Sequence, residues 1–203
     1  MLAHLQAPHP GRCAQSMLNA TLREWQAMGG RDLWLFAYGS LIWKAEFEVL
    51  EKRPAKVHGH HRALKMWSRV NRGTPDRPGL VFALLSGGSC RGVVLRVASA
   101  TVPEMLPRLW EREMPNPVYD PKWLRCLTPD GPICPLGFTL SRHSPNYTGD
   151  LDHEEYRTIF AHARGRYGTT LEYARQTHEQ LQALGIRDRA LEALMRLPHT
   201  PDA

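Results

Sequence analysis

The sequence predicts an α+β fold on three observations. Short segments rich in apolar, aromatic and β-branched residues follow one another between positions 33 and 141, as in a sheet built from neighbouring strands. Apolar residues at helical spacing occur before this region, once within it, and again after residue 151. With 203 residues, of which 42% are hydrophobic and 23% charged, the chain is long enough to bury one substantial core.

Composition argues against several classes of protein. The four cysteines show neither CxxC spacing nor nearby paired histidines, so we predict no zinc site and no disulfide framework, and we expect reduced thiols and a cytoplasmic protein. The first ten residues lack the basic and apolar regions of a signal peptide, and no apolar run is long enough to span a membrane. The formal net charge of +6 favours an anionic partner, either a small acidic substrate or a nucleic-acid backbone.

An N-terminal extension precedes the predicted domain. Prolines interrupt residues 1–15, so we expect this stretch to be frayed. Residues 16–28 carry apolar side chains at helical spacing before Gly29-Gly30, which predicts an amphipathic helix on the outside of the domain or a helix for a partner. We therefore expect an extension over residues 1–30 and a single domain over residues 31–203.

The first strand of the domain ends in an unusual turn. Residues 33–38 are apolar or aromatic and predict a buried strand. Gly39 and Ser40 predict a sharp turn inside the core, which would direct backbone N–H groups at a nearby group. On these two residues alone, an ordinary core strand that ends in a tight turn is the preferred interpretation. Ser40 as a nucleophile would need a positioned base, and no adjacent feature supplies one.

Most other elements follow from alternation, caps and turn residues. We expect two strands over residues 55–67 that Gly59 bends or bulges, a long loop over 67–79, strands 80–85 and 91–97 joined by a turn at 86–89, strands 119–127 and 134–141 joined by a turn at 128–131, and helices over 152–164, 169–184 and 188–195. His58 and His60 would share one strand face, but no third ligand is evident. We therefore interpret them as partly exposed strand residues and predict no metal site.

A helix between the strands carries an acidic residue on its apolar face. Thr101 is a suitable N-cap, and Pro103 fits the first turn. The stripe that should face the core consists of Val102, Met105, Leu106, Leu109 and Trp110. The next stripe position is Glu113, and Pro115 then ends the helix.

Two interpretations of Glu113 are open. The helix end frays, so that the carboxylate reaches water or pairs with an arginine, or the carboxylate lies in a sheltered pocket where desolvation raises its pKa toward neutrality. In the second case it could take and return a proton. Glu111 and Arg112 lie off the stripe and are expected in solvent, with Glu111 pointing to the opposite side and dispensable.

Four motifs, in order along residues 33–185, resemble the ChaC-like gamma-glutamylcyclotransferases. They are Phe36-Ala-Tyr-Gly-Ser-Leu-Ile-Trp43, Asn71-Arg-Gly-Thr-Pro-Asp-Arg-Pro-Gly79, Trp110-Glu-Arg-Glu-Met114 followed by Tyr119, and Leu171-Glu-Tyr173. The resemblance implies a small mixed β-barrel with surrounding helices. It also implies cleavage of glutathione to 5-oxoproline and cysteinylglycine without a cofactor.

The resemblance further implies the roles of particular residues. Glu113 matches the family's catalytic glutamate, Tyr173 a tyrosine that helps to hold the substrate, and Arg72 an arginine of the substrate site. The substrate-binding loop corresponds to Ala37, Tyr38, Gly39, Ser40, Leu41 and Ile42. The expected partner is a small γ-glutamyl compound, with neither nucleic acid nor membrane. Glutathione, other γ-glutamyl amino acids and γ-glutamylamines share the reacting half, so the leaving group stays open, as does the oligomeric state.

A second function, from a different class, is a basic module that binds nucleic acid on a barrel face. It would use Lys56, Arg62, Lys65, Arg69, Arg72 and Arg77, with Trp67 among them. These charges are scattered through a loop, as solvated charges usually are. We therefore rank this function below the enzyme.

Overall fold

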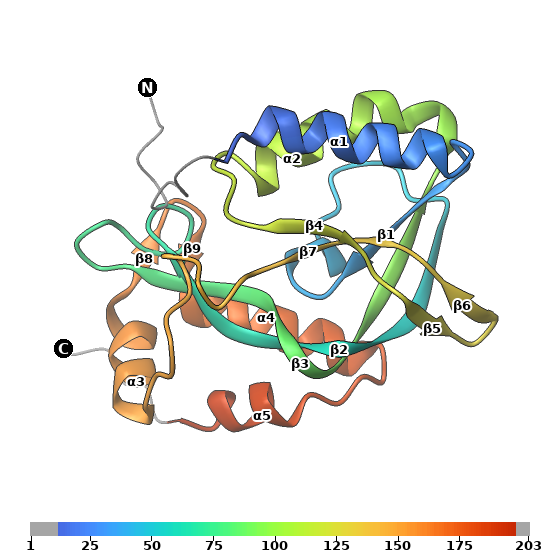
Figure 1. Cartoon of the computed structure of the whole chain (residues 1–203). Helices are drawn as coiled ribbons and strands as arrows, with labels where there is room; N and C mark the ends of the chain where they lie inside the picture. The colour runs from blue at the N-terminus through green and yellow to red at the C-terminus, as the bar shows by residue number, and fades with distance from the viewer. Residues whose placement is uncertain (1–11, 198–203) are drawn as a thin grey trace.

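The computed structural model describes residues 12–197. Within them a curled seven-stranded sheet has the order β4-β7-β1-β3-β2-β5-β6, and β8 and β9 form a separate ribbon (Figure 1). The strands are β1 Leu33–Ala37, β2 Glu51–Ser68, β3 Gly79–Val97, β4 Asp120–Trp123, β5 Cys126–Thr128, β6 Gly131–Ile133, β7 Leu136–Thr139, β8 Arg164–Gly165 and β9 Gly168–Thr169. The helices are α1 Ala14–Ala27, α2 Val102–Glu113, α3 His153–His162, α4 Thr170–Ala183 and α5 Arg189–Met195, with 3-10 turns η1 Ser40–Ile42 and η2 Ser99–Thr101. The predicted α+β class is confirmed.

Strands β2 and β3 form one long antiparallel pair at the centre of the sheet. Their pairing runs from Glu51 opposite Arg96 to Ser68 opposite Gly79, so each is a single strand where two were predicted. The predicted turn at residues 86–89 is wrong, because these residues stay in β3. Glycines with positive φ on both strands instead produce a register shift there, which confirms the bulge at Gly59. The true connection of the pair is the loop over residues 69–78.

The second half of the sheet is a hairpin with a break in the middle. Its turn lies at residues 128–131 as predicted, but the predicted strand 119–127 divides into β4 and β5, and β6 precedes the predicted strand 134–141, which contains β7. The outer parts pair as β4 with β7 and the inner parts as β5 with β6, and Leu124 N donates to Pro135 O between them at 2.8 Å. Since β7 also pairs in parallel with β1, the sheet is mixed.

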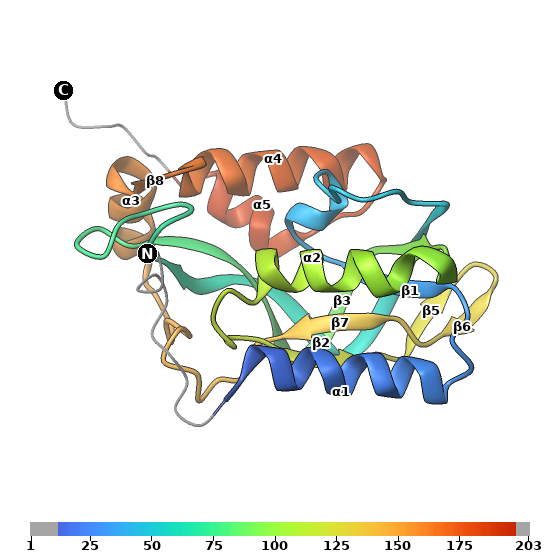
Figure 2. The ribbon, with the colours of Figure 1, turned by 90° about the horizontal axis from the view of Figure 1, so that it is seen from above.

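Helices flank the sheet on two sides. Helices α1 and α2 lie side by side above it in Figure 1, and in Figure 2 α4 and α5 lie together on the side of the molecule opposite α1. Helix α1 buries Leu18, Thr21 and Trp25, and its Ala14 carbonyl accepts from the indole of Trp110 at 3.0 Å. The predicted fraying of residues 1–15 falls mostly outside the described residues, but the helix already begins at Ala14.

The caps of the C-terminal helices are as predicted. Asp152 with Glu155, and Thr169 with Glu172, each form a reciprocal capping box, and Asp188 accepts from the Leu191 amide at 3.1 Å. The expected side-chain cap by Thr101 is absent, because a 3-10 turn precedes α2 and the hydroxyl donates to the Ala98 carbonyl at 2.9 Å.

Candidate active site

A cavity of about 860 Å³ opens beside the C-terminal end of α2. Its wall is formed by the turn after β1, the start of the loop after β2, the first turns of α4, and the tip of the β8–β9 ribbon. These segments are far apart in the sequence, and the long β2–β3 pair brings them together. The cavity contains Glu113, the acidic residue that interrupts the stripe of α2.

Helix α2 places Glu113 in this cavity. The apolar stripe is buried as predicted, and Glu113 is the last residue of the helix, followed by buried Met114. Only 17% of the Glu113 side chain is exposed. Burial raises the pKa of this carboxyl above its usual range, the negative charge of Glu46 adds to the increase, and Arg112 opposes it. The sheltered position therefore describes Glu113 better than a frayed end in solvent.

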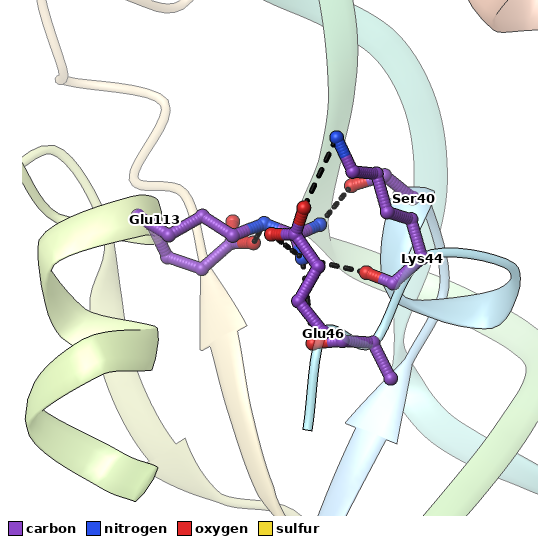
Figure 3. A network of polar contacts seen from close by, with 6 residues as sticks. Ser40, Lys44, Glu46 and Glu113 are labelled. Carbon is purple, nitrogen blue, oxygen red and sulfur yellow. Dashed lines mark hydrogen bonds and ion pairs between the residues drawn. The ribbon is translucent and has the colours of Figure 1, made fainter. Parts of the chain in front are cut away.

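Arg112 ties the end of α2 to the loop after β1, which corrects the expectation that it is solvated. Its guanidinium donates to Ser40 Oγ at 3.1 Å, to Glu46 Oε2 at 3.0 Å and to the Lys44 carbonyl at 2.5 Å. It also lies 3.2 Å from Glu113 Oε1. Figure 3 shows Glu113 reaching from the helix end toward the segment that carries Ser40, Lys44 and Glu46. The arginine thus fixes the distance between carboxylate and loop.

Hydrogen bonds to the core fix the turn after β1. Tyr38 is buried, its hydroxyl donates to the Phe138 carbonyl at 2.8 Å, and its own carbonyl accepts from Arg62 at 3.0 Å. Gly39 precedes η1, whose first amide groups have no acceptor within so short a helix. The Ser40 backbone is hydrogen-bonded to the Tyr173 hydroxyl, so a negatively charged group in the cavity would approach this amide beside that hydroxyl.

Tyr173 lies against this turn from α4. A Cβ on Gly39 would stand 3.0 Å from the Tyr173 hydroxyl, so glycine permits the contact. The Phe82 amide donates to the same hydroxyl at 3.4 Å, and the Arg72 guanidinium lies 5.0 Å from the ring centre. Burial raises the pKa of Tyr173 to about 12, so its hydroxyl is protonated near neutral pH.

A third buried tyrosine, Tyr119, lines the cavity and was not among the predicted site residues. Burial raises its pKa well above the usual value, as it does for Tyr38, and the charge of Glu113 adds to both increases. The charge of Glu113 thus acts on Tyr38, Tyr119 and Tyr173, whose hydroxyls remain protonated near neutral pH. The position of Tyr119 in the motif after Met114 was the signal that could have identified it.

The structure separates the predicted site residues into two groups. Those that line the cavity together are Tyr38, Gly39, Ser40, Leu41, Arg72, Glu113 and Tyr173. Ala37 and Ile42 do not line it; both are buried in the core. Glu111 is exposed as expected, but it lies at the edge of the same cavity rather than away from it.

Other kinds of site receive no support from the described residues. No three His, Cys, Asp or Glu side chains between residues 12 and 197 gather closely enough to hold a metal ion. No helix in that part of the chain has both the length and the apolar character needed to cross a membrane. Arg62, one of the basic residues considered for nucleic acid, is buried and ion-paired with Asp188, so a phosphate backbone cannot reach it. All four cysteines are free.

Comparison with known proteins agrees with this architecture. The family described as ChaC-like protein matches residues 33–200. The chain belongs to the ChaC-like family.

Two relatives of this chain are named as γ-glutamylcyclotransferases. The glutathione-specific gamma-glutamylcyclotransferase of Escherichia coli (strain K12) is 32% identical over 164 residues, which cover 80% of this chain and 71% of the relative. The glutathione-specific gamma-glutamylcyclotransferase 1 of Homo sapiens is 31% identical over 170 residues, 80% of this chain and 77% of the relative. Helix α1 precedes residues 33–200, the part of the chain that the family matches.

The fold of this ChaC-like chain also occurs among solved structures. The crystal structure of a gamma-glutamyl cyclotransferase specific to glutathione from yeast superimposes with a TM-score of 0.75, and the match covers 82% of this chain and 95% of the yeast chain. At 20% sequence identity, this likeness concerns the fold. It confirms the gamma-glutamylcyclotransferase-like fold predicted from the motifs.

Proposed function

We propose that this protein is a γ-glutamylcyclotransferase that cleaves glutathione to 5-oxoproline and cysteinylglycine, with Glu113 as the general acid and base. The single observation that carries the role of Glu113 is a carboxyl of raised pKa, only 17% exposed, in the same cavity as the turn after β1. The names of relatives that share about a third of its sequence support the choice of substrate.

The reaction suits a site with one carboxylate. The α-amine of the γ-glutamyl group attacks the γ-carbonyl carbon of the same group, a C–N bond closes the five-membered ring, and the amide bond to the cysteine nitrogen breaks. Because nucleophile and electrophile are already tethered, much of the acceleration can come from holding the folded conformer. Glu113 takes a proton from the α-ammonium, and the attacking nitrogen loses a second proton as the ring closes. Both protons pass to the departing cysteine nitrogen, the carboxylate of Glu113 carrying one at a time, so the carboxylate is regenerated when cysteinylglycine leaves as an ammonium.

The surrounding groups have complementary roles. Backbone N–H groups of Gly39, Ser40 and Leu41 would bind the α-carboxylate and stabilise the oxyanion that develops on the attacked carbonyl. The neutral hydroxyl of Tyr173, packed on Gly39, would donate to the same part of the substrate. Arg72, which lies over the Tyr173 ring, adds positive charge on this side of the cavity.

The decisive experiment compares two glutamates of α2. Glu113→Gln should reduce the rate of 5-oxoproline release from glutathione by about 10²–10⁴-fold, the usual contribution of a general acid–base. Glu104→Gln is the matched control, because Glu104 is exposed in the first turn of the same helix and does not line the cavity. Glu111→Gln should also retain activity, although its place at the cavity edge makes it the less stringent control. Equal rates for Glu113→Gln and Glu104→Gln would exclude this mechanism.

The same assay addresses the substrate. Wild-type protein is incubated in parallel with glutathione, γ-glutamyl-alanine and a γ-glutamylamine, and 5-oxoproline is followed by chromatography. The proposal predicts release from glutathione at the highest kcat/KM. If 5-oxoproline were released only from the other two compounds, the protein would still be a cyclotransferase, but glutathione would not be its substrate.

A further inference from the structure

The cavity is lined by four cations and four carboxylates, and one of these cations, Arg166, has no ion pair among the described residues. Among the lining cations, Arg112 is bound to Glu113 and Glu46, and Lys44 pairs with Glu46 at 3.1 Å. Arg72 lies over the Tyr173 ring and donates to the Tyr167 carbonyl. Arg166 also lines the cavity, is exposed, and forms no ion pair within residues 12–197.

Arg166 is held in place by its backbone. It and Tyr167 form the two-residue tip of the β8–β9 ribbon. The Arg166 amide donates to the Val70 carbonyl at 2.7 Å, and the Tyr167 amide donates to the Asn71 carbonyl at 3.0 Å. A Cβ on Gly165 would stand 2.4 Å from the Val70 oxygen, so the ribbon lies directly on the loop after β2. The backbone that carries Arg166 is therefore ordered before a ligand arrives, and binding has only the side chain to order.

The tip also presents an aromatic ring between two cations. Tyr167 is 53% exposed, which is unusual for so large a side chain in this structure. Lys44 Nζ lies 5.1 Å from its ring centre and the Arg166 guanidinium 5.4 Å. The ring thus brings two positive charges to the cavity opening from segments that are more than one hundred residues apart.

We propose that Arg166, together with Lys44, binds a carboxylate on the leaving half of the substrate. This inference rests on the proposed function. If the γ-glutamyl group lies between Glu113 and the turn after β1, the amide that breaks must project toward the exposed rim. In glutathione the leaving half is a dipeptide, which spans about 7 Å when extended and ends in a carboxylate. The substrate class is therefore a γ-glutamyl peptide with a free C-terminus, and Arg166 determines this specificity without touching the reacting atoms.

The test combines two substrates with two variants. Wild-type protein, Arg166→Gln and Arg164→Gln are assayed for 5-oxoproline release from glutathione and from its glycine monoethyl ester, in which the carboxylate is blocked far from the reacting carbonyl. Arg164 is the matched control, because it lies two residues away in the same ribbon but does not line the cavity. Both side chains are exposed, and thermal melting confirms that each variant is folded.

Wild-type protein and Arg164→Gln should prefer glutathione over the ester by about tenfold in kcat/KM, as expected for one charge-assisted interaction. In Arg166→Gln the preference should disappear, mainly through a higher KM for glutathione, and Arg166→Lys should restore part of it. An unchanged preference in Arg166→Gln, or equal use of both substrates by wild-type protein, would overturn this inference alone. No 5-oxoproline from either substrate with wild-type protein would overturn the proposed function as well.

Discussion

Arg62 and Asp188 form a buried ion pair, and we expect a large loss of stability when the charge of Asp188 is removed. The Arg62 side chain is 2% exposed, and its Nε and Nη2 lie 2.9 and 2.7 Å from Asp188 Oδ2. The change Asp188→Asn keeps the size of the side chain and an oxygen that can cap α5, because asparagine is as good an N-cap as aspartate. With that oxygen on the Leu191 amide, the new NH2 group replaces Oδ2, so the change removes the negative charge and the acceptor that Arg62 uses.

Removing one partner of a buried pair leaves an uncompensated charge, which typically costs about 3–5 kcal/mol. The lower end applies here, since Arg62 Nη1 still donates to two carbonyls, at 3.0 Å to Tyr38 and 3.1 Å to Arg91. We therefore expect the free energy of unfolding to fall by about 3 kcal/mol, which lowers the urea midpoint by about 1 to 1.5 M. Activity should fall too, because Arg62 anchors the carbonyl immediately before Gly39.

Urea unfolding followed by tryptophan fluorescence measures the effect. The control is Asp150→Asn, which breaks the ion pair with Lys65 at a position where the Asp150 side chain is 93% exposed, so the midpoint should not move. If the free energy of unfolding fell by less than about 1 kcal/mol in Asp188→Asn, the buried guanidinium would not depend on this carboxylate. That result would refute the reasoning.

Two further predictions concern the site. As a base, Glu113 must be ionised, and burial raises its pKa, so kcat/KM should decrease as the pH falls through a midpoint above the usual glutamate range. Because the charge of Glu46 adds to that increase, Glu46→Gln should move this limb of the pH–rate profile to lower pH, whereas an unmoved limb would contradict the assignment. Gly39→Ala should lower kcat/KM about tenfold, because its Cβ would lie 3.0 Å from the Tyr173 hydroxyl and displace the groups that hold the substrate. The loss should be smaller in a Tyr173→Phe background, which lacks that hydroxyl, and an equal loss in both backgrounds would show that the contact is not the cause.

Local signals predicted the helices better than the sheet. Capping residues and an apolar stripe lie within a few positions of each other, so the ends of α2, α3 and α4 could be predicted from neighbours in the sequence. Strand boundaries depend on a partner strand. Gly87 and Gly88 have the composition of a hairpin turn, yet their positive φ angles produce a bulge, because β2 continues to pair on both sides of them. Only the register across the whole pair decides between the two outcomes. The division of the chain at residue 30 stays a prediction.

The site shows the same limit. The stripe of α2 identified Glu113 as a residue in an apolar position, because the helical period alone defines which side faces the core. Arg112 lies off that stripe and was assigned to solvent, but the loop after β1 folds over the helix end and supplies its acceptors. No pattern in the sequence around Arg166 indicated a role in the site. Its significance depends on a ribbon that contacts a loop almost one hundred residues earlier in the chain.

The position of Glu113 explains how one chain can both fold and hold a reactive carboxyl. The folded state raises the pKa of this group, so the native protein binds its proton more tightly than the unfolded chain does. The contribution of this group to stability therefore decreases as the pH rises from the unfolded value through the folded pKa, and the proposed mechanism uses the ionised form that prevails above it. The five buried apolar residues of the same stripe can offset this cost, at about 1.5–3 kcal/mol for each large side chain. It follows that Glu113→Gln should be at least as stable as the wild-type protein near neutral pH while its activity is lost, since the charge that burial disfavours is the charge that the reaction needs.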